Sequence, residues 1–160
     1  MSKLRIGQGY DVHRFSPERR LVLGGVEIDY QYGLLGHSDA DVLLHALMDA
    51  LLGAMALGDI GKHFPDTDKL YENISSLELL SKVYSMMCAE GYELVNLDAT
   101  VVLERPKISN FIPDMVKNIA AALKTAPENV SVKATTEEGL GFTGMGEGAA
   151  AYAVALIEKK

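Results

Sequence analysis

The sequence predicts an α+β fold: a single-domain sandwich in which a mixed β-sheet carries helices mainly on one face. Two observations support this prediction. Short runs rich in β-branched residues alternate with longer runs of helical periodicity, and the turns between them contain glycine, proline and aspartate. At 160 residues the chain is long enough to bury one sizeable core, and it carries no repeat or low-complexity tract. We therefore expect residues 1–160 to form one domain.

Five segments are predicted to be β-strands. Residues 4–9 and 21–28 flank a turn-rich connection, and we expect them to pair as antiparallel neighbours. Residues 93–104 and 130–136 contain runs of β-branched residues, which favour strands. Residues 149–157 are compatible with a helix, which alanine favours, as well as with a strand, and we predict a strand there.

Three helices are also predicted, at residues 40–57, 75–90 and 108–124. Ser38 or Asp39 would cap the first of them, because a side-chain oxygen there can accept a hydrogen bond from the first turn. Gly58 would end the first helix and Gly91 the second. Two glycine-rich segments are predicted to be loops: residues 58–68 and 138–148.

Charge and composition limit the classes of partner. The chain has 15 basic and 22 acidic residues and a formal charge of -7, which argues against nucleic acid or an anionic membrane but not against an anionic substrate. The most apolar segment, residues 42–57, is shorter than the roughly 20 residues of a membrane span, and no signal peptide opens the chain. The single Cys88 is interpreted as a small core side chain in a reducing cytosol. We therefore expect a cytoplasmic protein.

Three residues are candidate metal ligands: Asp11, His13 and His45. Side chains two apart on an extended strand leave the same face, so Asp11 and His13 can reach one point, and His45 lies in an apolar helical run. One carboxylate and two imidazoles suit zinc, and three protein ligands leave its fourth position open for water or substrate. The same residues are compatible with a chance spacing on the strand and a hydrogen-bonded core histidine.

Asp41, His45 and Asp49 form one polar line along this otherwise apolar helix, because they recur at intervals of four residues. Two interpretations stand. The line is a solvated stripe, or His45 binds metal while a carboxylate holds its second ring nitrogen or contacts substrate hydroxyls.

Three other segments give weaker signals. His37 and Ser38 precede the first helix, where free amides favour anions, although simple capping explains them better. Residues 133–148 combine five glycines with hydroxyls and carboxylates, and either hold phosphoryl oxygens or form ordinary turns. Residues 105–107 follow a predicted strand, as a plain turn or as a place where backbone groups recognise the edge of a base.

Four longer motifs follow one another along the chain: Gly9-Tyr-Asp-Val-His-Arg-Phe15, Gly36-His-Ser-Asp-Ala-Asp-Val-Leu-Leu-His-Ala46, Gly58-Asp-Ile-Gly-Lys-His-Phe-Pro-Asp-Thr-Asp68 and Lys133-Ala-Thr-Thr-Glu-Glu-Gly-Leu-Gly-Phe-Thr-Gly144. In this order they closely resemble the 2-C-methyl-D-erythritol 2,4-cyclodiphosphate synthases of the non-mevalonate isoprenoid pathway, over nearly the whole chain. Four motifs in the right order are far more specific than any one of them, so the metal interpretation is favoured.

The resemblance implies a lyase that converts 4-diphosphocytidyl-2-C-methyl-D-erythritol 2-phosphate to 2-C-methyl-D-erythritol 2,4-cyclodiphosphate and releases CMP. It also implies one Zn2+ per subunit on Asp11, His13 and His45, a second divalent cation, Mg2+ or Mn2+, and a homotrimer with active sites between subunits. The substrate's own phosphate would attack, so the protein needs no activated serine or cysteine, and positioning with charge neutralisation would supply most of the acceleration.

The resemblance further implies roles for individual residues. His37 and Thr136 would stabilise the transition state, and Ser38 would hold the phosphate end of the substrate. Residues 103–109 would form the cytidine pocket, and residues 135–138 would approach the phosphates and the second metal. The implied substrate-binding residues are Asp11, His13, His37, Ser38, Asp59, Gly61, Phe64, Asp66, Asp68, Leu103, Lys107, Thr135, Thr136, Glu138 and Phe142.

One position departs from the family pattern. Many members have an arginine where this chain has Met145, and that arginine is associated with an isoprenoid diphosphate in the central cavity of the trimer. Methionine cannot pair with a diphosphate as arginine does, so we expect weak or purely apolar binding of such ligands. Two other functions compete with the synthase: a zinc-dependent phosphohydrolase that uses metal-bound hydroxide, and a trimeric metal-binding scaffold whose glycine loops are only turns.

Overall fold

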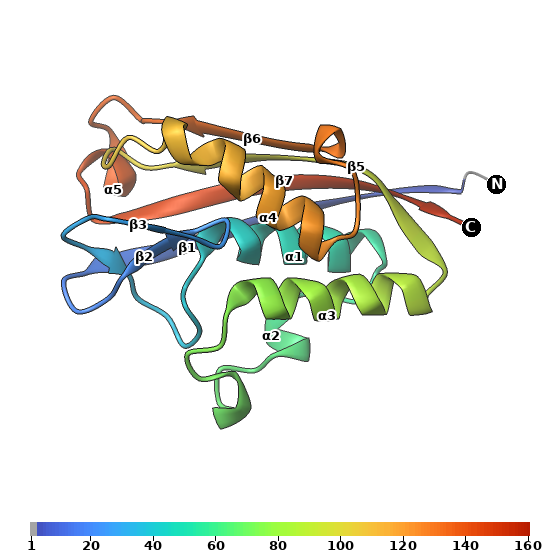
Figure 1. Ribbon diagram of the computed structural model, residues 1–160. Coiled ribbons are helices and arrows are strands. Elements are labelled where there is room, and N and C mark those ends of the chain that lie inside the picture. The colour runs from blue at the N-terminus through green and yellow to red at the C-terminus, as the bar shows by residue number, and fades with distance from the viewer. Residues whose placement is uncertain (1–2) are drawn as a thin grey trace.

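A computed structural model describes residues 3–160 of the chain (Figure 1). Its strands are β1 (Leu4–Ser16), β2 (Leu21–Leu23), β3 (Val26–Ile28), β4 (Gly33–Leu34), β5 (Tyr92–Val102), β6 (Val130–Thr135) and β7 (Gly148–Lys159). Five of them form one mixed sheet in the order β4-β1-β7-β5-β6, and β2 and β3 form a separate two-stranded sheet. β5 and β6 are parallel, and the other pairs are antiparallel.

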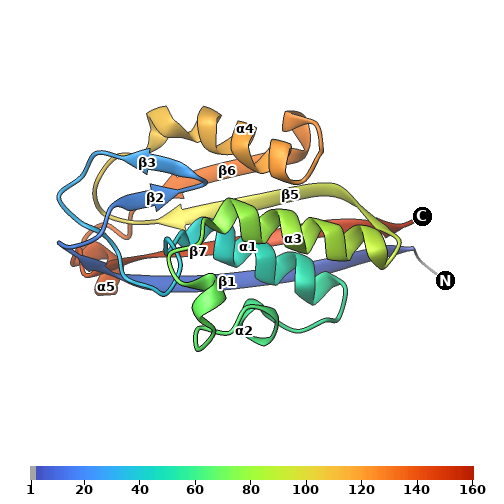
Figure 2. The same cartoon turned by 60° about the horizontal axis from the view of Figure 1, so that its bottom comes forward.

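The helices are α1 (Val42–Ala54), α2 (Ile60–His63), α3 (Ser76–Ala89), α4 (Ile112–Ala122) and α5 (Gly141–Gly144), with 3-10 turns at Lys69–Tyr71, Ser109–Phe111 and Pro127–Asn129. α1 lies against β1 and β7, α4 lies against β6, and α3 packs on both α1 and α4 (Figures 1 and 2). The predicted α+β fold with a mixed sheet is confirmed.

Two glycines let α1 lie very close to β1. A Cβ atom added at Gly9 would lie 1.9 Å from the carbonyl oxygen of Ala46, and one added at Gly7 would lie 1.9 Å from that of Ala50. No side chain fits in this space, so the backbones of the helix and the strand come into direct contact. This close approach brings His45 within reach of side chains on β1.

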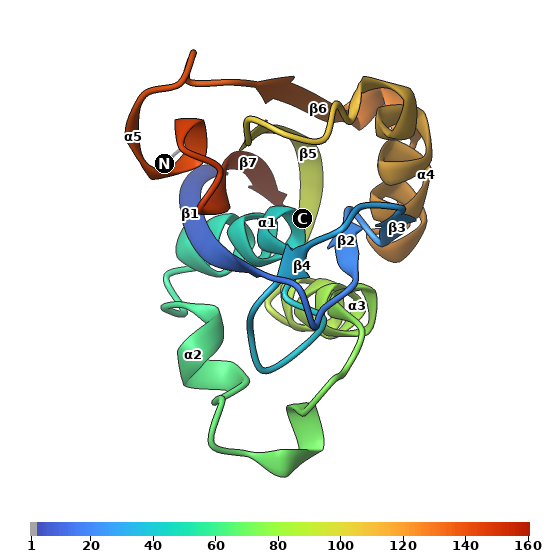
Figure 3. The same ribbon diagram turned by 90° about the vertical axis from the view of Figure 1, so that its left-hand side faces the viewer.

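The long helices lie on one side of the sheet, as Figure 3 shows along the strands. On the other side, β1 and β7 present exposed apolar side chains that we call the open face: Ile6, Tyr10, Val12, Tyr152 and Val154. Ile6 is 71% exposed, and the ring centroids of Tyr10 and Tyr152 are 4.9 Å apart. An exposed apolar patch of this kind is typical of a surface that binds another protein chain.

The predicted pairing of residues 4–9 with residues 21–28 is wrong. The first segment belongs to β1, which continues to Ser16 and pairs with β7 along most of its length. The second segment is broken by Gly24 and Gly25, whose φ angles of 58° and 71° turn the chain into the β2–β3 hairpin. The other three predicted strands are confirmed as β5, β6 and β7.

The first predicted helix, α1, has different ends from those expected. Its cap is Asp41, and not Ser38 or Asp39, because the Asp41 side chain accepts a hydrogen bond from the first turn. The helix ends at Ala54, well before Gly58.

Both predicted loops, residues 58–68 and 138–148, contain a short helix, α2 in the first and α5 in the second. The helix predicted at residues 75–90 is confirmed as α3. Ser75 caps it, and Gly91 follows its end with a φ of 71°.

The helix predicted at residues 108–124 is confirmed in part, since α4 is preceded by a 3-10 turn. Cys88 is exposed, so its assignment to the core is wrong: it lies on the solvent side of α3. Among the described residues, no helix is long and apolar enough to cross a membrane. The cytoplasmic location stays a prediction.

Candidate functional site

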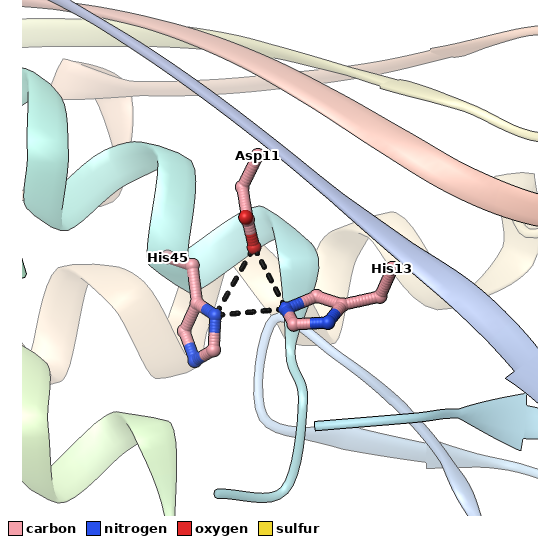
Figure 4. A group of neighbouring side chains, drawn as sticks. All are labelled: Asp11, His13 and His45. Atoms are coloured by element: carbon pink, nitrogen blue, oxygen red, sulfur yellow. Dashed lines mark hydrogen bonds and ion pairs between the residues drawn. The ribbon is translucent and has the colours of Figure 1, made fainter. Parts of the chain in front are cut away.

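Asp11, His13 and His45 converge at one point (Figure 4). Asp11 and His13 lie on the face of β1 that α1 covers, two residues apart, as the period of a strand requires. The Oδ2 atom of Asp11 is 2.9 Å from Nε2 of His13 and 3.1 Å from Nδ1 of His45, and the two ring nitrogens are 3.1 Å apart. One ligand atom from each residue thus lies within 4.8 Å of the other two.

Each histidine ring is held on the side away from this point. Nδ1 of His13 is 2.8 Å from the carbonyl oxygen of Leu35, which can only accept, so in the neutral ring Nε2 keeps a free lone pair. Nε2 of His45 lies 3.0 Å from Oγ of Ser38 and 3.1 Å from Oγ of Ser76. The remaining nitrogen of each ring faces the carboxylate. This donor set fits a divalent metal, and the cluster is consistent with a metal site.

Interactions within this cluster shift the pKa values of Asp11 and His13. Burial alone would raise the pKa of Asp11, but hydrogen bonds with His13 and His45 outweigh burial and lower this pKa to about 2. Burial would lower the pKa of His13, and the hydrogen bond and charge of Asp11 reverse this effect and raise it. Asp11 therefore stays an anion throughout the physiological pH range and offers a permanent negative charge to a cation.

The polar line on α1 is not a solvated stripe. Asp41 is fully buried, and its carboxylate accepts hydrogen bonds from the N–H groups of Gly25 at 2.8 Å and Leu44 at 3.1 Å. Burial and the nearby charge of Asp39 raise the pKa of Asp41 to about 6. Asp41 thus caps the helix and ties the β2–β3 hairpin to it.

Asp49, at the other end of the polar line, also has a partner elsewhere. Its Oδ1 atom accepts a hydrogen bond from the N–H of Ile60 at 2.7 Å, which holds the start of α2. The prediction that a carboxylate of this line holds the second nitrogen of His45 is wrong, because the hydroxyls of Ser38 and Ser76 lie there. Neither hydroxyl could be assigned to His45 from spacing, since both come from outside the helix.

A cavity of about 470 Å³ opens over the three converging side chains, and we call it the cluster cavity. It brings Asp11, His13 and His45 together with five other predicted site residues: His37, Ser38, Gly61, Phe64 and Asp66. Sequence reasoning missed the other lining residues, which are Leu35, Gly36, Ile60, Tyr71 and Leu79. Leu35, Gly36 and Ile60 adjoin predicted residues, whereas Tyr71 and Leu79 carry no local signal.

Two predicted residues beside this cavity support its walls. Asp59 caps α2 by accepting a hydrogen bond from the N–H of Lys62 at 3.1 Å. Asp68 accepts one from the N–H of Leu70 at 2.9 Å, and its carbonyl oxygen lies 3.1 Å from Nε2 of His37. Neither carboxylate is among the groups that line the cluster cavity.

A second cavity, of about 230 Å³, lies where the parallel strands β5 and β6 end, and we call it the strand-end cavity. Four residues predicted individually line it: Leu103, Lys107, Thr135 and Thr136. Four more belong to the segment 103–109 that was predicted to form the cytidine pocket, namely Glu104, Pro106, Ile108 and Ser109, and the last lining residue is Ala134. Like Asp59 and Asp68, two further predicted residues lie outside both cavities: Glu138, which accepts a hydrogen bond from the Thr136 hydroxyl at 3.3 Å, and Phe142, which is exposed on α5.

The two cavities do not meet within one chain. β1 and β6 are separated by β7 and β5, which is about 14 Å at the usual strand spacing. His37 and Thr136, the two residues with an implied catalytic role, line different cavities. A single chain therefore does not bring the whole set of predicted site residues together.

The chain was compared with known proteins. A family model described as the YgbB family matches residues 4–158. The 2-C-methyl-D-erythritol 2,4-cyclodiphosphate synthase of Clostridium novyi (strain NT) is 57% identical over 98% of this chain and 100% of its own length. The synthase of Geotalea uraniireducens (strain Rf4) is 58% identical over 98% of this chain and 100% of its own length. The chain belongs to this synthase family.

Solved structures of the synthase family agree with the fold. A Plasmodium falciparum IspF complex with CDP has a TM-score of 0.87 and 34% identity, and the match covers 100% of this chain and 99% of that one. The bifunctional IspDF of Campylobacter jejuni has a TM-score of 0.95 and 43% identity; all of this chain matches 43% of that longer protein. The predictions of the synthase family, and of a lyase in the non-mevalonate isoprenoid pathway, are confirmed.

Proposed function

We propose that residues 1–160 act as one cyclodiphosphate synthase domain, which converts 4-diphosphocytidyl-2-C-methyl-D-erythritol 2-phosphate to 2-C-methyl-D-erythritol 2,4-cyclodiphosphate and CMP. The curated relatives that carry this synthase name support the proposal at 57% identity over nearly the whole chain. In the structure, the observation that carries it is the convergence of Asp11, His13 and His45 at a cavity of about 470 Å³. A cavity of this size suits a phosphorylated small molecule.

The reaction needs no nucleophile from the protein. A bond forms between an oxygen of the substrate's 2-phosphate and the β-phosphorus, while the bond from the β-phosphorus to the oxygen that bridges to the α-phosphorus breaks. The electron pair of the broken bond leaves with CMP. The chain's one cysteine, Cys88, is exposed on α3 and takes no part. The protein's work is to hold phosphoryl groups in line and to offset their charge.

Two cations are assigned to this reaction. One Zn2+ per subunit belongs to Asp11, His13 and His45, because one carboxylate and two imidazoles suit zinc and leave a ligand position open. When bound there, zinc supplies a Lewis acid for a phosphoryl oxygen. The second cation, Mg2+ or Mn2+, is assigned to the substrate phosphates beside Glu138, since hard cations take oxygen ligands.

The chain's own residues divide the remaining work between the two cavities. In the cluster cavity, His37 and Ser38 are assigned to the phosphoryl oxygens, to which the Ser38 hydroxyl can donate. In the strand-end cavity, the Thr136 hydroxyl would donate to a phosphoryl oxygen in place of Glu138, and His37 and Thr136 stabilise the transition state from different cavities. The methylerythritol and ribose parts are assigned to Asp59, Gly61, Phe64, Asp66 and Asp68, and the cytidine and phosphate parts to Leu103, Lys107, Thr135, Glu138 and Phe142.

The separation of the cavities supports a homotrimer with active sites between subunits. Since one chain holds His37 and Thr136 apart, we assign a complete active site to the cluster cavity of one subunit and the strand-end cavity of its neighbour. The open face supports this assembly because exposed side chains such as Ile6 and Tyr152 would be buried between subunits. The CDP complexes among related solved structures support a cytidine nucleotide as the ligand.

The decisive assay measures CMP release from the cytidyl substrate while zinc and magnesium are varied separately. We expect release to require both ions, and phosphorus NMR to detect a cyclic diphosphate. A linear phosphate product would favour the phosphohydrolase instead. Binding of zinc without any CMP release would favour the non-catalytic scaffold.

Sharing of the site between subunits has its own test. His45→Ala inactivates the cluster cavity and Thr136→Ala the strand-end cavity, so each variant alone should have little activity. When the two are unfolded, mixed and refolded together, about a quarter of the sites would combine two intact cavities if assembly is random. Recovery of about a quarter of wild-type turnover is expected, and no recovery would place both cavities' functions within one subunit.

A further inference from the structure

Buried polar groups lie behind His45, on the side away from Asp11. Ser76, in the first turn of α3, is fully buried, and its Oγ atom lies 3.1 Å from Nε2 of His45. The same Oγ atom donates its proton to Oδ1 of Asp39 at 2.5 Å, and the backbone N–H of Ser76 donates to Oδ2 of Asp39 at 2.9 Å. The Asp39 carboxylate therefore holds both the backbone and the hydroxyl of Ser76.

The direction of these hydrogen bonds makes Nε2 of His45 the donor towards Ser76. A carboxylate only accepts, so the hydroxyl proton of Ser76 is committed to Asp39. Towards His45 the Ser76 oxygen then acts as an acceptor, and Nε2 is the donor. In a neutral ring this leaves the lone pair on Nδ1, the atom that faces Asp11 and His13.

Ser38 does not favour one tautomer of His45 over the other. Its Oγ atom lies 3.0 Å from Nε2 of His45 and accepts a hydrogen bond from the N–H of Ala40. Its own proton is not committed to another acceptor within residues 3–160, so Ser38 can accept from Nε2 or donate to it. Ser38 is thus compatible with either tautomer, whereas Ser76 is compatible with one.

We infer that Ser76 and Asp39 are positioning residues for the metal site: the Asp39 carboxylate orients the Ser76 hydroxyl, and this hydroxyl keeps His45 in the tautomer whose Nδ1 binds the metal. The inference rests on the proposed metal site at Asp11, His13 and His45. It adds to that site two residues that contact neither metal nor substrate. Loss of such partners typically weakens metal binding by about 10- to 100-fold.

The tautomer is readable in the metal-free protein. Long-range proton–nitrogen correlation NMR at alkaline pH distinguishes a ring protonated on Nε2 from one protonated on Nδ1, and the chain has only 4 histidines. The Asp11 carboxylate, 3.1 Å from Nδ1, is the competing acceptor in the metal-free protein. We expect the Ser76 acceptor to prevail, so that His45 is protonated on Nε2 in the wild type. A wild-type ring protonated on Nδ1 would overturn the inference, whatever any variant does.

Two variants test the origin of this preference. Ser76→Ala removes the acceptor. Asp39→Asn keeps the shape of the side chain but brings an amide that can donate to the Ser76 oxygen, which frees the hydroxyl to donate to His45. We expect both variants to reduce the fraction of His45 protonated on Nε2.

Zinc affinity, measured by competition with a chromogenic chelator, gives the second readout. We expect the Kd of Ser76→Ala and of Asp39→Asn to rise at least about tenfold, and Ser76→Thr, which keeps a hydroxyl, to restore most of the affinity. Ser81→Ala is the matched control, since Ser81 lies exposed on the same helix and donates to the carbonyl of Leu77; its Kd should not change.

The outcomes separate the two proposals. A wild type that does not bind zinc would contradict the metal site itself. A wild type that binds zinc, with Ser76→Ala and Asp39→Asn within about twofold of it, would contradict the positioning role alone. Circular dichroism tests whether each variant is folded. If Ser76→Ala does not fold, the zinc affinity of Asp39→Asn and the tautomer of His45 in the wild type still test the positioning role.

Discussion

The cluster cavity and the strand-end cavity differ in how much of their chemistry one chain completes. In the cluster cavity, Asp11, His13 and His45 are already in contact, each ring is held from behind, and the carboxylate is ionised. The strand-end cavity, at about 230 Å³ against about 470 Å³, is lined by apolar side chains, by the hydroxyls of residues such as Thr136, and by the charged side chains of Glu104 and Lys107. Charged groups are thus in direct contact with one another in the first cavity, whereas the second combines hydroxyls with two charged side chains.

The difference has a physical reason. Charges that face one another in a partly buried place are costly unless their geometry is held, and direct contact of α1 with β1 at Gly7 and Gly9 provides a rigid base for them. Hydroxyls and free backbone groups at the ends of strands need less support. A change at the cluster should therefore abolish chemistry outright, whereas a change in assembly should leave both cavities intact and separate them.

The largest effect is expected from His45→Ala, which breaks the cluster. Turnover should fall at least about 1,000-fold because metal-assisted charge stabilisation is lost, and zinc content should fall with it while the trimer persists. Metal analysis, CMP release and size-exclusion chromatography measure the three properties. His63→Ala is the control, since the His63 ring contacts the carbonyl of Leu57 and not the cluster. Full activity in zinc-free protein would contradict the metal assignment.

The second effect, in order of size, is expected from Ile6→Lys on the open face. A charge there should dissociate the trimer, because burial of an unpaired lysine in a subunit interface is costly. Turnover should fall about 100-fold through loss of the neighbour's cavity, while each monomer still binds one zinc. Glu128→Lys, which also introduces a lysine but on an exposed 3-10 turn, should alter neither property. Retention of full activity by a monomeric Ile6→Lys variant would contradict a shared site.

Sequence reasoning predicted individual strands and helices well, but it did not predict which strands pair with each other. The strands β5 and β6 and the helix α3 carry their own propensities and caps, and all three were found where expected. β1 was assigned the wrong neighbour because its partner, β7, comes from the other end of the chain. Pairing over such a distance depends on the whole sheet, which no local pattern encodes.

The same limit applies to the candidate site. The strand period predicted that Asp11 and His13 share a face, and the structure places them so. Asp41 and Asp49 were misread because their partners, the amides of Gly25 and Ile60, belong to other segments. Ser76 gave no signal at all, since only packing of α3 on α1 brings its hydroxyl to the cluster.

A smaller effect, on stability, is expected at Asp41, whose role does not depend on either cavity. Its pKa in the folded protein, about 6, lies above the usual value of 3.8, so its contribution to stability is full below about pH 4 and is lost as the pH rises through 6. Asp41→Asn has no such proton to lose. The unfolding free energy of the wild type relative to this variant should therefore fall by about 2 kcal/mol between pH 4 and pH 7.

Urea unfolding of the two proteins at several pH values measures this difference. Zinc affinity at neutral pH is the companion measurement, and we expect it to change little, because Asp41 contacts the amides of Gly25 and Leu44 and not the cluster. If the difference in unfolding free energy is constant across this pH range, folding does not raise the pKa of Asp41.

The smallest effect is expected at Met145, which lies outside both cavities and is 71% exposed at the end of α5. A thioether does not pair with a diphosphate as a guanidinium does, so calorimetric titration with geranyl diphosphate should detect weak binding. Met145→Arg should tighten that binding several-fold at low salt and leave turnover unchanged, since neither cavity is altered. The expectation would be contradicted if the wild type bound geranyl diphosphate tightly and did not bind geraniol. Another cationic group of the assembled protein would then bind the diphosphate.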